Sequence, residues 1–505
     1  MRTALRLLLC LIGFAGLLGT GYAWIVSSPT GASPDDDYHQ TSIWCPRPIE
    51  KHCPIVGTTD QGEPLVEVPQ TVDTSSIRYA YQQDTSAAVL DGMDDDILAS
   101  TSRVDLGDYP GYYYTVMNLL VEKDVDRAIL VMRWVNFSLT ILLFGGAFLL
   151  LKHPGRRLLG YTLLATSLPI TIYFTTSVNP TAWALAGIVS AWIGLQGFFT
   201  STSWRRTGLG AIAALGATLA AMSRLDSAMY AVIVSVAMVV LHGRYILAKK
   251  TLLLLPLMIS MIGAVLFFTT HSTTLTAQSA MIDGPRNPWQ VFFTNTVHLP
   301  GILVNFWNVD LGWFDVPNPT IVGILAVLIT FVIAGRGFIR ARCDWHKAAA
   351  LVIIGGSIFA LPVMMMQTRM LYLSEWGIQV RYLAPLIIVF FGLLMTGSPR
   401  TDPPELPWQI ALGCFSAFII AHAVLLHTLI RRYVTGMDVT GFNLDINAEW
   451  WRSAGPSPMM TWTLGSLGMT CIVFIPCLLS LRPPMIRTTA GESISIVNKT
   501  QLGTP

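Results

Sequence analysis

Long apolar runs separated by short polar segments recur along most of the chain. They lie near residues 5–27, 130–151, 158–176, 181–199, 207–222, 227–242, 251–270, 319–336, 347–366, 382–398, 407–428 and 460–481. Most are close to the length that a helix needs to cross a bilayer, and the two at 207–242 are shorter. The pattern predicts an all-α polytopic membrane protein with about 12 transmembrane helices. All but the first belong to a bundle at 130–481.

The distribution of lysine and arginine predicts how the chain is oriented. Arg2 and Arg6 precede the first run, and basic residues follow the second, fourth, sixth, eighth and tenth runs. Short cytoplasmic loops carry an excess of these residues. We therefore expect a multi-pass protein of the cell (plasma) membrane, with both termini cytoplasmic and a cytoplasmic tail at 482–505.

Residues 1–27 combine a basic start with an apolar stretch long enough to span a membrane. We expect this segment to be an uncleaved signal anchor. A cleaved signal peptide is the competing interpretation.

The longer polar segments then lie on the extracytoplasmic side. The largest covers 28–129, and others lie near 271–318, 367–381 and 429–459. Within the first, "EPLVEVPQTV" predicts a short extended piece. The stretch "GYYYTVMNLLVEKDVDRAIL" predicts an amphipathic helix on the membrane surface, although its tyrosines could equally form a plain aromatic belt.

Composition agrees with this class and limits the partners. Hydrophobic residues make up 52% of the 505 positions and charged residues only 12%. A net charge of +2 gives no reason to expect a nucleic-acid partner, whereas the lipid bilayer is a partner by necessity. Cys45 and Cys53 share one polar segment, where a disulfide is expected if that side is oxidising.

An acidic cluster follows the first run closely. Asp35, Asp36 and Asp37 precede His39, and carboxylates held at a membrane surface can act as a general base or bind a divalent cation. The alternative is a solvated linker. A second triplet at 94–96 has the same composition but lies deep inside the long loop, where it predicts a helix start or a weak calcium loop.

Further polar residues fall at the outer ends of predicted helices. Arginine is unexpected on that side, and an anionic phosphate would explain it, because the guanidinium binds phosphate through two parallel hydrogen bonds. For Arg224 and Asp226, a purely structural ion pair is the alternative. The remaining residues at these ends are Asn179, Asp315, Gln379, Arg381, Arg431 and Arg432.

Together these features resemble the GT-C superfamily of membrane glycosyltransferases, which carry an acidic motif in the first large outer loop. More narrowly, the chain resembles an uncharacterised family of polytopic membrane proteins that is common in actinobacteria and related to GT-C. That family's P-D-E-x-x-H motif corresponds to Pro34, Asp35, Asp36 and His39, with aspartate in place of glutamate.

Four shorter motifs follow in the same order. The Pro-Pro-x-Tyr-Tyr motif appears as "PGYYY", which includes Tyr113 and departs at Gly111. An Asn-Pro turn corresponds to Asn179 and Pro180. A "GWxDxPxP" motif corresponds to Gly312, Trp313, Asp315, Pro317 and Pro319. A "GxQGRY" motif corresponds to Gly377, Gln379, Arg381 and Tyr382, and it departs at Val380.

The resemblance implies sugar transfer on the outer face, from a polyprenyl-phosphate donor to a cell-envelope glycan or lipid acceptor, with inversion at the anomeric carbon. Asp35 is the expected base, and Asp36 is expected to assist it by orienting the acceptor or binding a cation. No cofactor is certain, although a divalent cation on these two carboxylates is possible. The departing phosphate would use Arg381, with Arg224 as the second candidate. The expected substrate-binding set is completed by His39, Tyr113, Asn179, Asp226, Asp315 and Gln379.

Two alternatives come from other functional classes. A lipid-linked glycan flippase or transporter would need charged residues distributed through the helix interiors, whereas here they gather on one side. A non-catalytic envelope assembly protein would use the first loop as a docking surface.

Overall fold

The computed structural model describes residues 2–270, 286–340, 343–368, 370–373, 379–397 and 405–480. The predicted tail at 482–505, the segment 271–285 of the second outer loop, and Gly377 lie outside the described residues.

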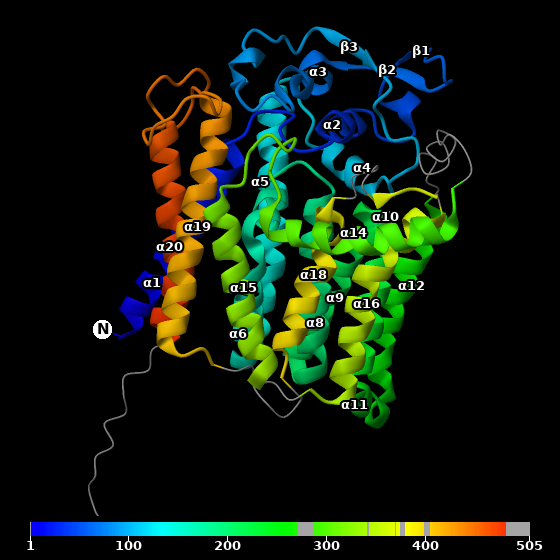
Figure 1. Ribbon diagram of the computed structural model, residues 1–505, viewed down its shortest axis with the longest axis vertical. Coiled ribbons are helices and arrows are strands. Elements are labelled where there is room, and N and C mark those ends of the chain that lie inside the picture. The colour runs from blue at the N-terminus through cyan, green and yellow to red at the C-terminus, as the bar shows by residue number, and fades with distance from the viewer. Residues whose placement is uncertain are drawn as a thin grey trace, which may run out of the picture.

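Helices form nearly all of the molecule, and most of them run parallel in one bundle (Figure 1). Each predicted apolar run falls on a helix. In the described part of the chain, nine helices are long and apolar enough to cross a membrane, and α10 and α18 are shorter apolar helices. The protein is therefore a mostly helical polytopic membrane protein. The bundle helices are α1 (Arg2–Val26), α5 (Val125–Leu150), α6 (His153–Thr166), α7 (Ile172–Thr175), α8 (Thr181–Thr200), α9 (Ser203–Ser223), α10 (Leu225–Leu241), α12 (Leu254–Thr269), α15 (Thr320–Arg340), α16 (Trp345–Thr368), α18 (Val380–Met395), α19 (Trp408–Val434) and α20 (Pro458–Ser480).

Small residues let some of these helices approach closely. Gly16 of α1 faces Gly468 of α20, and a side chain at either position would collide with the other helix. Gly187 of α8 meets Gly216 of α9 in the same way. Such contacts replace the hydrophobic driving force that is absent between helices in lipid. The helix predicted as a signal anchor is thus packed into the bundle.

The segment between α6 and α7 departs from a straight helix. Leu168, just before Pro169, has non-helical backbone angles within η3 (Ser167–Thr171). Proline lacks the N–H that would continue the helical ladder and its ring clashes with the preceding turn, which explains the kink.

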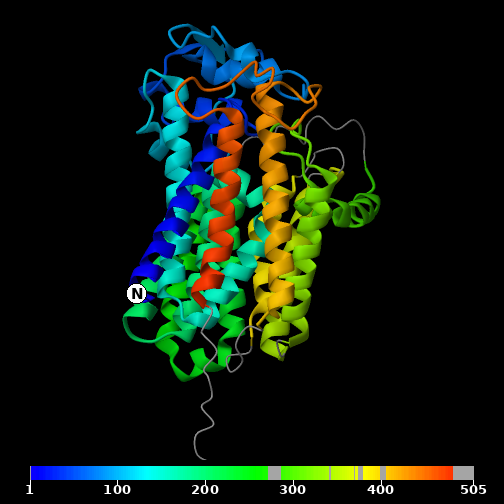
Figure 2. The ribbon, with the colours of Figure 1, turned by 90° about the vertical axis from the view of Figure 1, so that its left-hand side faces the viewer.

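Residues 27–124 form a cap over one end of the bundle (Figures 1 and 2). Its helical segments are α2 (Asp36–Trp44), η1 (Ile49–Lys51), α3 (Gln70–Tyr79), η2 (Ala87–Leu90) and α4 (Tyr112–Asn118). An antiparallel sheet in the order β1-β2-β3 joins β1 (Ile55–Thr58), β2 (Pro64–Pro69) and β3 (Leu98–Thr101), with Glu67 opposite Ser100. The predicted extended piece corresponds to β2 and the start of α3. Cys45 and Cys53 form a disulfide.

Two parts of the long loops differ from expectation. The single amphipathic helix predicted at 111–130 was wrong in extent, because α4 ends at Asn118 and α5 begins at Val125. Tyr113 and Tyr114 are buried in the cap core instead of lying in an aromatic belt. The predicted loop at 271–318 contains an unpredicted helix, α14 (Pro288–Asn308), which runs across the bundle (Figure 1).

Candidate functional site

The segment that leads into the acidic cluster forms a buried turn at the junction of the cap and the bundle. Residues 27–34 are all buried. Their carbonyls accept hydrogen bonds from side chains of many elements, which excludes the solvated-linker interpretation. The donors are Arg133 and Arg452 to Ser28, Arg133 to Pro29, Tyr79 to Thr30, Trp313 to Gly31, Tyr173 and Tyr433 to Ala32, and Asn179 and Arg381 to Pro34.

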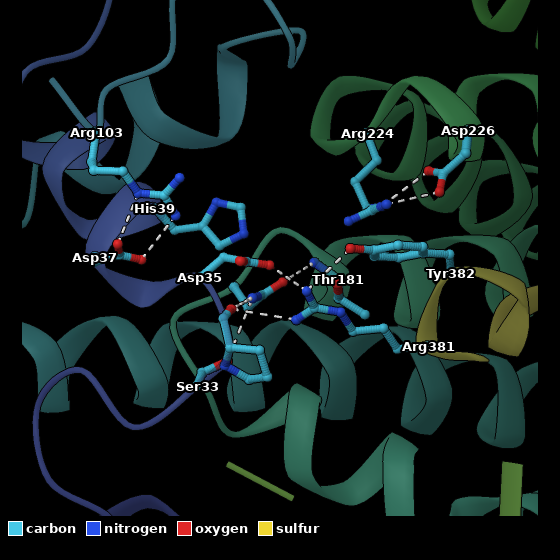
Figure 3. A network of polar contacts seen from close by, with 12 residues as sticks. Ser33, Asp35, Asp37, His39, Arg103, Thr181, Arg224, Asp226, Arg381 and Tyr382 are labelled. Carbon is cyan, nitrogen blue, oxygen red and sulfur yellow. Dashed lines mark hydrogen bonds and ion pairs between the residues drawn. The ribbon is translucent and has the colours of Figure 1, made fainter. Parts of the chain in front are cut away.

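Asp35 ends this turn in a left-handed backbone conformation. Its φ is 63° and its ψ is 21°, immediately before α2. Residues other than glycine, asparagine and aspartate rarely adopt this region, because the Cβ approaches the carbonyl oxygen. The conformation directs the Asp35 side chain towards α18 while α2 continues away from it (Figure 3). The side chain is 37% exposed.

Asp35 and Arg381 are in direct contact. The Nη2 atom of Arg381, at the start of α18, donates to the Oδ2 atom of Asp35, and its Nη1 atom donates to the carbonyl of Pro34. The guanidinium is nearly buried, at 4% exposure, and its Nε atom has no hydrogen-bond partner. The ion pair therefore joins an accessible carboxylate to a buried cation with one unused donor.

The protonation state of Asp35 follows from two opposing effects. Burial raises the pKa of this carboxyl, but the charge of Arg381 and its hydrogen bond outweigh burial, and the net pKa is lowered. Asp35 is consequently ionised at neutral pH.

Asp36 points away from Asp35 and is completely buried. Its Oδ2 atom accepts hydrogen bonds from the Ser33 amide, at 2.9 Å, and from the Gln40 side chain, at 3.0 Å. Burial raises its pKa to about 8, so the carboxyl holds a proton at neutral pH. Its hydrogen bonds with Ser33 and Gln40 fix the first turn of α2, and the substrate or cation contact predicted for Asp36 stays a prediction.

Asp37 and the second triplet have structural partners. Asp37 pairs with Arg103 of the cap, with Oδ2 2.8 Å from Nε. Asp95 accepts hydrogen bonds from Thr71 and from the Val125 amide, and the exposed Asp96 pairs with Lys123. The second triplet thus closes a turn of the cap against the start of α5.

His39 is 1% exposed and its ring lies beside Asp35 (Figure 3). Its Nδ1 atom is 2.9 Å from the hydroxyl of Tyr114, and its ring meets Tyr109 edge to face. Burial lowers the pKa of His39 to about 3. The imidazole is therefore neutral and supports the site from inside the cap.

Tyr113 and Asn179 were predicted to bind substrate, but both are buried and bonded internally. The Tyr113 hydroxyl accepts a hydrogen bond from Asn136 at 3.1 Å. The Asn179 side chain donates to the Pro34 carbonyl at 3.2 Å and accepts from the Thr181 amide at 3.0 Å. Asn179 thus shares with Arg381 the task of holding the carbonyl that precedes Asp35.

Arg224 and Asp226 form the predicted ion pair. Two guanidinium nitrogens lie 3.0 and 2.8 Å from the two carboxylate oxygens. The guanidinium also lies over the ring of Tyr382, 4.6 Å from its centre, while the Tyr382 hydroxyl accepts a hydrogen bond from Arg381 at 3.2 Å. Tyr382 therefore separates the two arginines and links them into one polar network (Figure 3).

A partly open pocket adjoins the Asp35–Arg381 pair. Its empty space of about 290 Å³ includes open solvent, and about 20 Å³ of it is accessible to the centre of a water molecule. Arg381 and Gln379 provide its cationic and amide groups, and most of the remaining wall is apolar. That wall comes from the turn before Asp35, from η3 and α7, and from the loop after α14: Pro34, Ile170, Tyr173, Phe174, Val309, Asp310, Leu311, Gly312 and Phe314.

Asp315, which was predicted to contact substrate, does not line this pocket. It forms a buried ion pair with Arg432, with Oδ2 and Nη2 2.6 Å apart. Arg432 also donates to the carbonyls of Tyr79 and Thr85 in the cap. The neighbouring Arg431 donates to the carbonyls of Gly441 and Asn443. These two arginines anchor loops, so they do not require an anionic ligand.

A cation bound by Asp35 and Asp36 would need further ligands from neighbouring side chains. In the described part of the chain, no group of three or more histidine, cysteine, aspartate or glutamate side chains is arranged to hold a metal ion. The two carboxylates also engage different partners.

Arg133 is an important residue that sequence reasoning missed. It is 1% exposed in α5 and donates to the carbonyls of Ile25, Ser28 and Pro29, where the chain leaves α1. A charged residue inside a predicted span was the available signal, because such residues are costly unless they have partners.

The comparisons with known proteins describe the chain at the level of a family. A family model described as "Predicted membrane protein (DUF2142)" matches residues 18–390, which include the whole cap and Arg381. A comparison with curated proteins gave no match. The predicted relation to GT-C enzymes and the predicted actinobacterial source stay predictions.

Proposed function

The chain belongs to the DUF2142 family of predicted membrane proteins, and we propose that it is a GT-C-type glycosyltransferase. It transfers a sugar from a polyprenyl-phosphate donor to a cell-envelope glycan or lipid acceptor, at the membrane face that bears the cap. The observation that carries this proposal is the pairing of an accessible, ionised Asp35 with the buried Arg381 beside a largely apolar pocket.

Each half of the reaction has a group suited to it. An acceptor hydroxyl attacks the anomeric carbon as the bond between that carbon and the phosphate oxygen breaks. The electron pair of that bond goes to the phosphate, and the hydroxyl proton goes to Asp35. Arg381, which lines the pocket, is the cation for the departing phosphate. Direct displacement inverts the anomeric centre.

Donor binding would also activate the base. In the resting site Arg381 holds the pKa of Asp35 down. A phosphate that engages the guanidinium competes for this interaction and adds negative charge nearby, and both effects raise the proton affinity of Asp35. The carboxylate therefore becomes a stronger base only when a donor is present.

The proposal is tested by Asp35→Asn, with Asp37→Asn as the matched control. Asparagine tolerates the left-handed backbone of residue 35 and removes only the charge. Asp37 carries the same group two residues away but pairs with Arg103. Both variants are expressed in a host that lacks the wild-type gene, and protein level and envelope sugar composition are measured.

We expect one envelope sugar to be depleted in the Asp35 variant out of proportion to any fall in protein level, and the Asp37 variant to resemble wild type. Unchanged envelope glycan in the Asp35 variant, at normal protein level, contradicts the proposal and favours an assembly protein. Accumulation of a lipid-linked glycan on the cytoplasmic leaflet would instead identify a flippase.

A further inference from the structure

Helix α14 lies across the bundle instead of along it. Figure 1 shows it in front of the vertical helices near the cap, and Figure 2 shows it beyond their flank. Its 21 residues contain no lysine, arginine, aspartate or glutamate. Large apolar side chains are nevertheless exposed on it, including Trp289 at 70%, Phe293 at 60% and Val297 at 74%.

Successive residues of a helix are rotated by about 100°, and on this spacing α14 has three faces. One face packs on the protein through Val291, Asn295, Leu299 and Phe306, all buried. A second face is exposed and apolar, with Trp289, Phe293, Val297, Pro300 and Val304. A third is exposed and polar, with Gln290, His298 and Asn305. A protein-facing, an apolar and a polar side are what a helix at a membrane boundary requires.

Neighbouring helices indicate what covers the apolar face. The ends of the spanning helices near α14 also expose large apolar groups: Phe268 of α12 is 77% exposed, Met364 of α16 is 61% exposed, and Ile321 of α15 is 47% exposed. α14 packs on α15 and α16. Its apolar face thus continues the exposed apolar surface of the spanning helices, which lipid covers in a bilayer, and Trp289 is of the type enriched at that depth.

We propose that α14 is an interfacial helix that lies in the plane of the bilayer, with its apolar face in the boundary between headgroups and acyl chains. This inference rests on geometry and does not depend on the proposed sugar transfer. It has a consequence for the pocket, because Val309, Asp310 and Leu311 follow α14 directly and line the pocket beside Arg381. The guanidinium is then placed to meet the charged headgroup of a ligand whose tail remains in the bilayer.

Spin labels at four positions of the apolar face test the proposal. The five cysteines outside the disulfide are replaced, and single cysteines are introduced by Trp289→Cys, Phe293→Cys, Val297→Cys and Val304→Cys. The full-length protein is reconstituted in phosphatidylcholine–phosphatidylglycerol vesicles. Collision with oxygen and with a water-soluble nickel complex then gives the depth of each label.

The matched control is α12, which runs along the bundle and exposes Leu257, Met261, Val265 and Phe268. Labels there are expected to change depth progressively, by about 1.5 Å per residue. The four labels on α14 extend over about 22 Å of helix, yet we expect them at one shallow depth within a few Å.

A staircase of depths along α14 overturns the proposal, because the helix would then insert across the bilayer. Nickel accessibility as high as that of a label introduced by Leu119→Cys, an 81% exposed position in the cap, also overturns it, because α14 would then lie in water. A normal staircase on α12 shows that the reconstituted protein is folded, so either outcome is decisive.

Discussion

The backbone at Asp35 decides which substitutions are informative. Alanine adopts the left-handed region at a cost of about 1–2 kcal/mol, whereas asparagine and glycine tolerate it. Alanine substitution therefore confounds loss of the carboxylate with strain.

We predict that the Asp35→Ala protein is less stable than the Asp35→Asn protein by about 1 kcal/mol, although both lose the ion pair with Arg381. Thermal unfolding in detergent measures the difference, with Asp35→Gly as a second strain-free variant. Equal stabilities of the alanine and asparagine variants would show that residue 35 relaxes out of the left-handed conformation.

Arg381 is predicted to need its guanidinium and not only its charge. Its Nη1 atom donates to the Pro34 carbonyl and its Nη2 atom to Asp35 and Tyr382, and the single ammonium of a lysine cannot reproduce this planar arrangement of two nitrogens. We expect Arg381→Lys to reduce the release of polyprenyl phosphate from an active donor by about 100-fold or more. The assay uses purified protein, a panel of polyprenyl-phosphate sugars and an envelope extract. If the lysine variant had wild-type activity, only the positive charge at position 381 would matter, and the prediction would be wrong.

At the scale of elements, one buried ion pair fastens the cap to the bundle. Asp315 and Arg432 are at most 1% exposed and link the loop after α14, α19 and two carbonyls of the cap. Removing one member leaves an uncompensated buried charge.

We therefore expect Asp315→Ala to lower the free energy of unfolding by about 3–5 kcal/mol. Asp96→Ala is the matched control, because Asp96 pairs with Lys123 where both side chains are mostly exposed. Its cost should be below about 1 kcal/mol. Denaturation in detergent measures both variants, and equal losses would contradict the structural role assigned to Asp315.

The elements also show which parts of the fold the hydropathy pattern predicts. The bilayer requires every spanning segment to satisfy its own backbone, so long apolar runs become helices wherever they occur. This is why each predicted run lies on a helix. β1, β3 and α14 escaped prediction because their positions depend on tertiary contacts that leave no periodic pattern of spanning length. Asp35 and Arg381 were identified by type and side, whereas the buried roles of Asn179 and Asp315 depend on partners distant in sequence.

At the scale of the whole molecule, two buried groups couple folding to pH in opposite directions. Burial raises the pKa of Asp36 from 3.8 to about 8. Between these values the folded state holds the extra proton, so stability falls as pH rises. Burial lowers the pKa of His39 from 6.5 to about 3. Between those values the unfolded state holds the extra proton, so stability falls as pH falls.

The effects of Asp36 and His39 on stability oppose each other between pH 3.8 and pH 6.5. Outside this pH range only one of the two groups makes stability depend on pH. From 6.5 to about 8 only the Asp36 contribution remains. Below 3.8 the His39 contribution is joined by that of Asp35, whose lowered pKa makes its ion pair another source of stability lost in acid. These groups thus predict a plateau near pH 4–6.5, with a decline on either side.

Two variants test the acid and alkaline declines in stability separately. Asparagine at position 36 resembles the protonated carboxyl, because one oxygen still accepts from Ser33 and Gln40 while the amide occupies the place of the hydroxyl. Asp36→Asn should therefore abolish the alkaline decline and leave the acid side unchanged. His39→Asn, which retains a polar atom for Tyr114, should weaken the acid decline alone. Thermal unfolding from pH 3 to 9 measures both. If Asp36→Asn keeps the wild-type decline above pH 6.5, residue 36 is ionised in the folded protein, and the buried neutral acid assigned to the start of α2 is excluded.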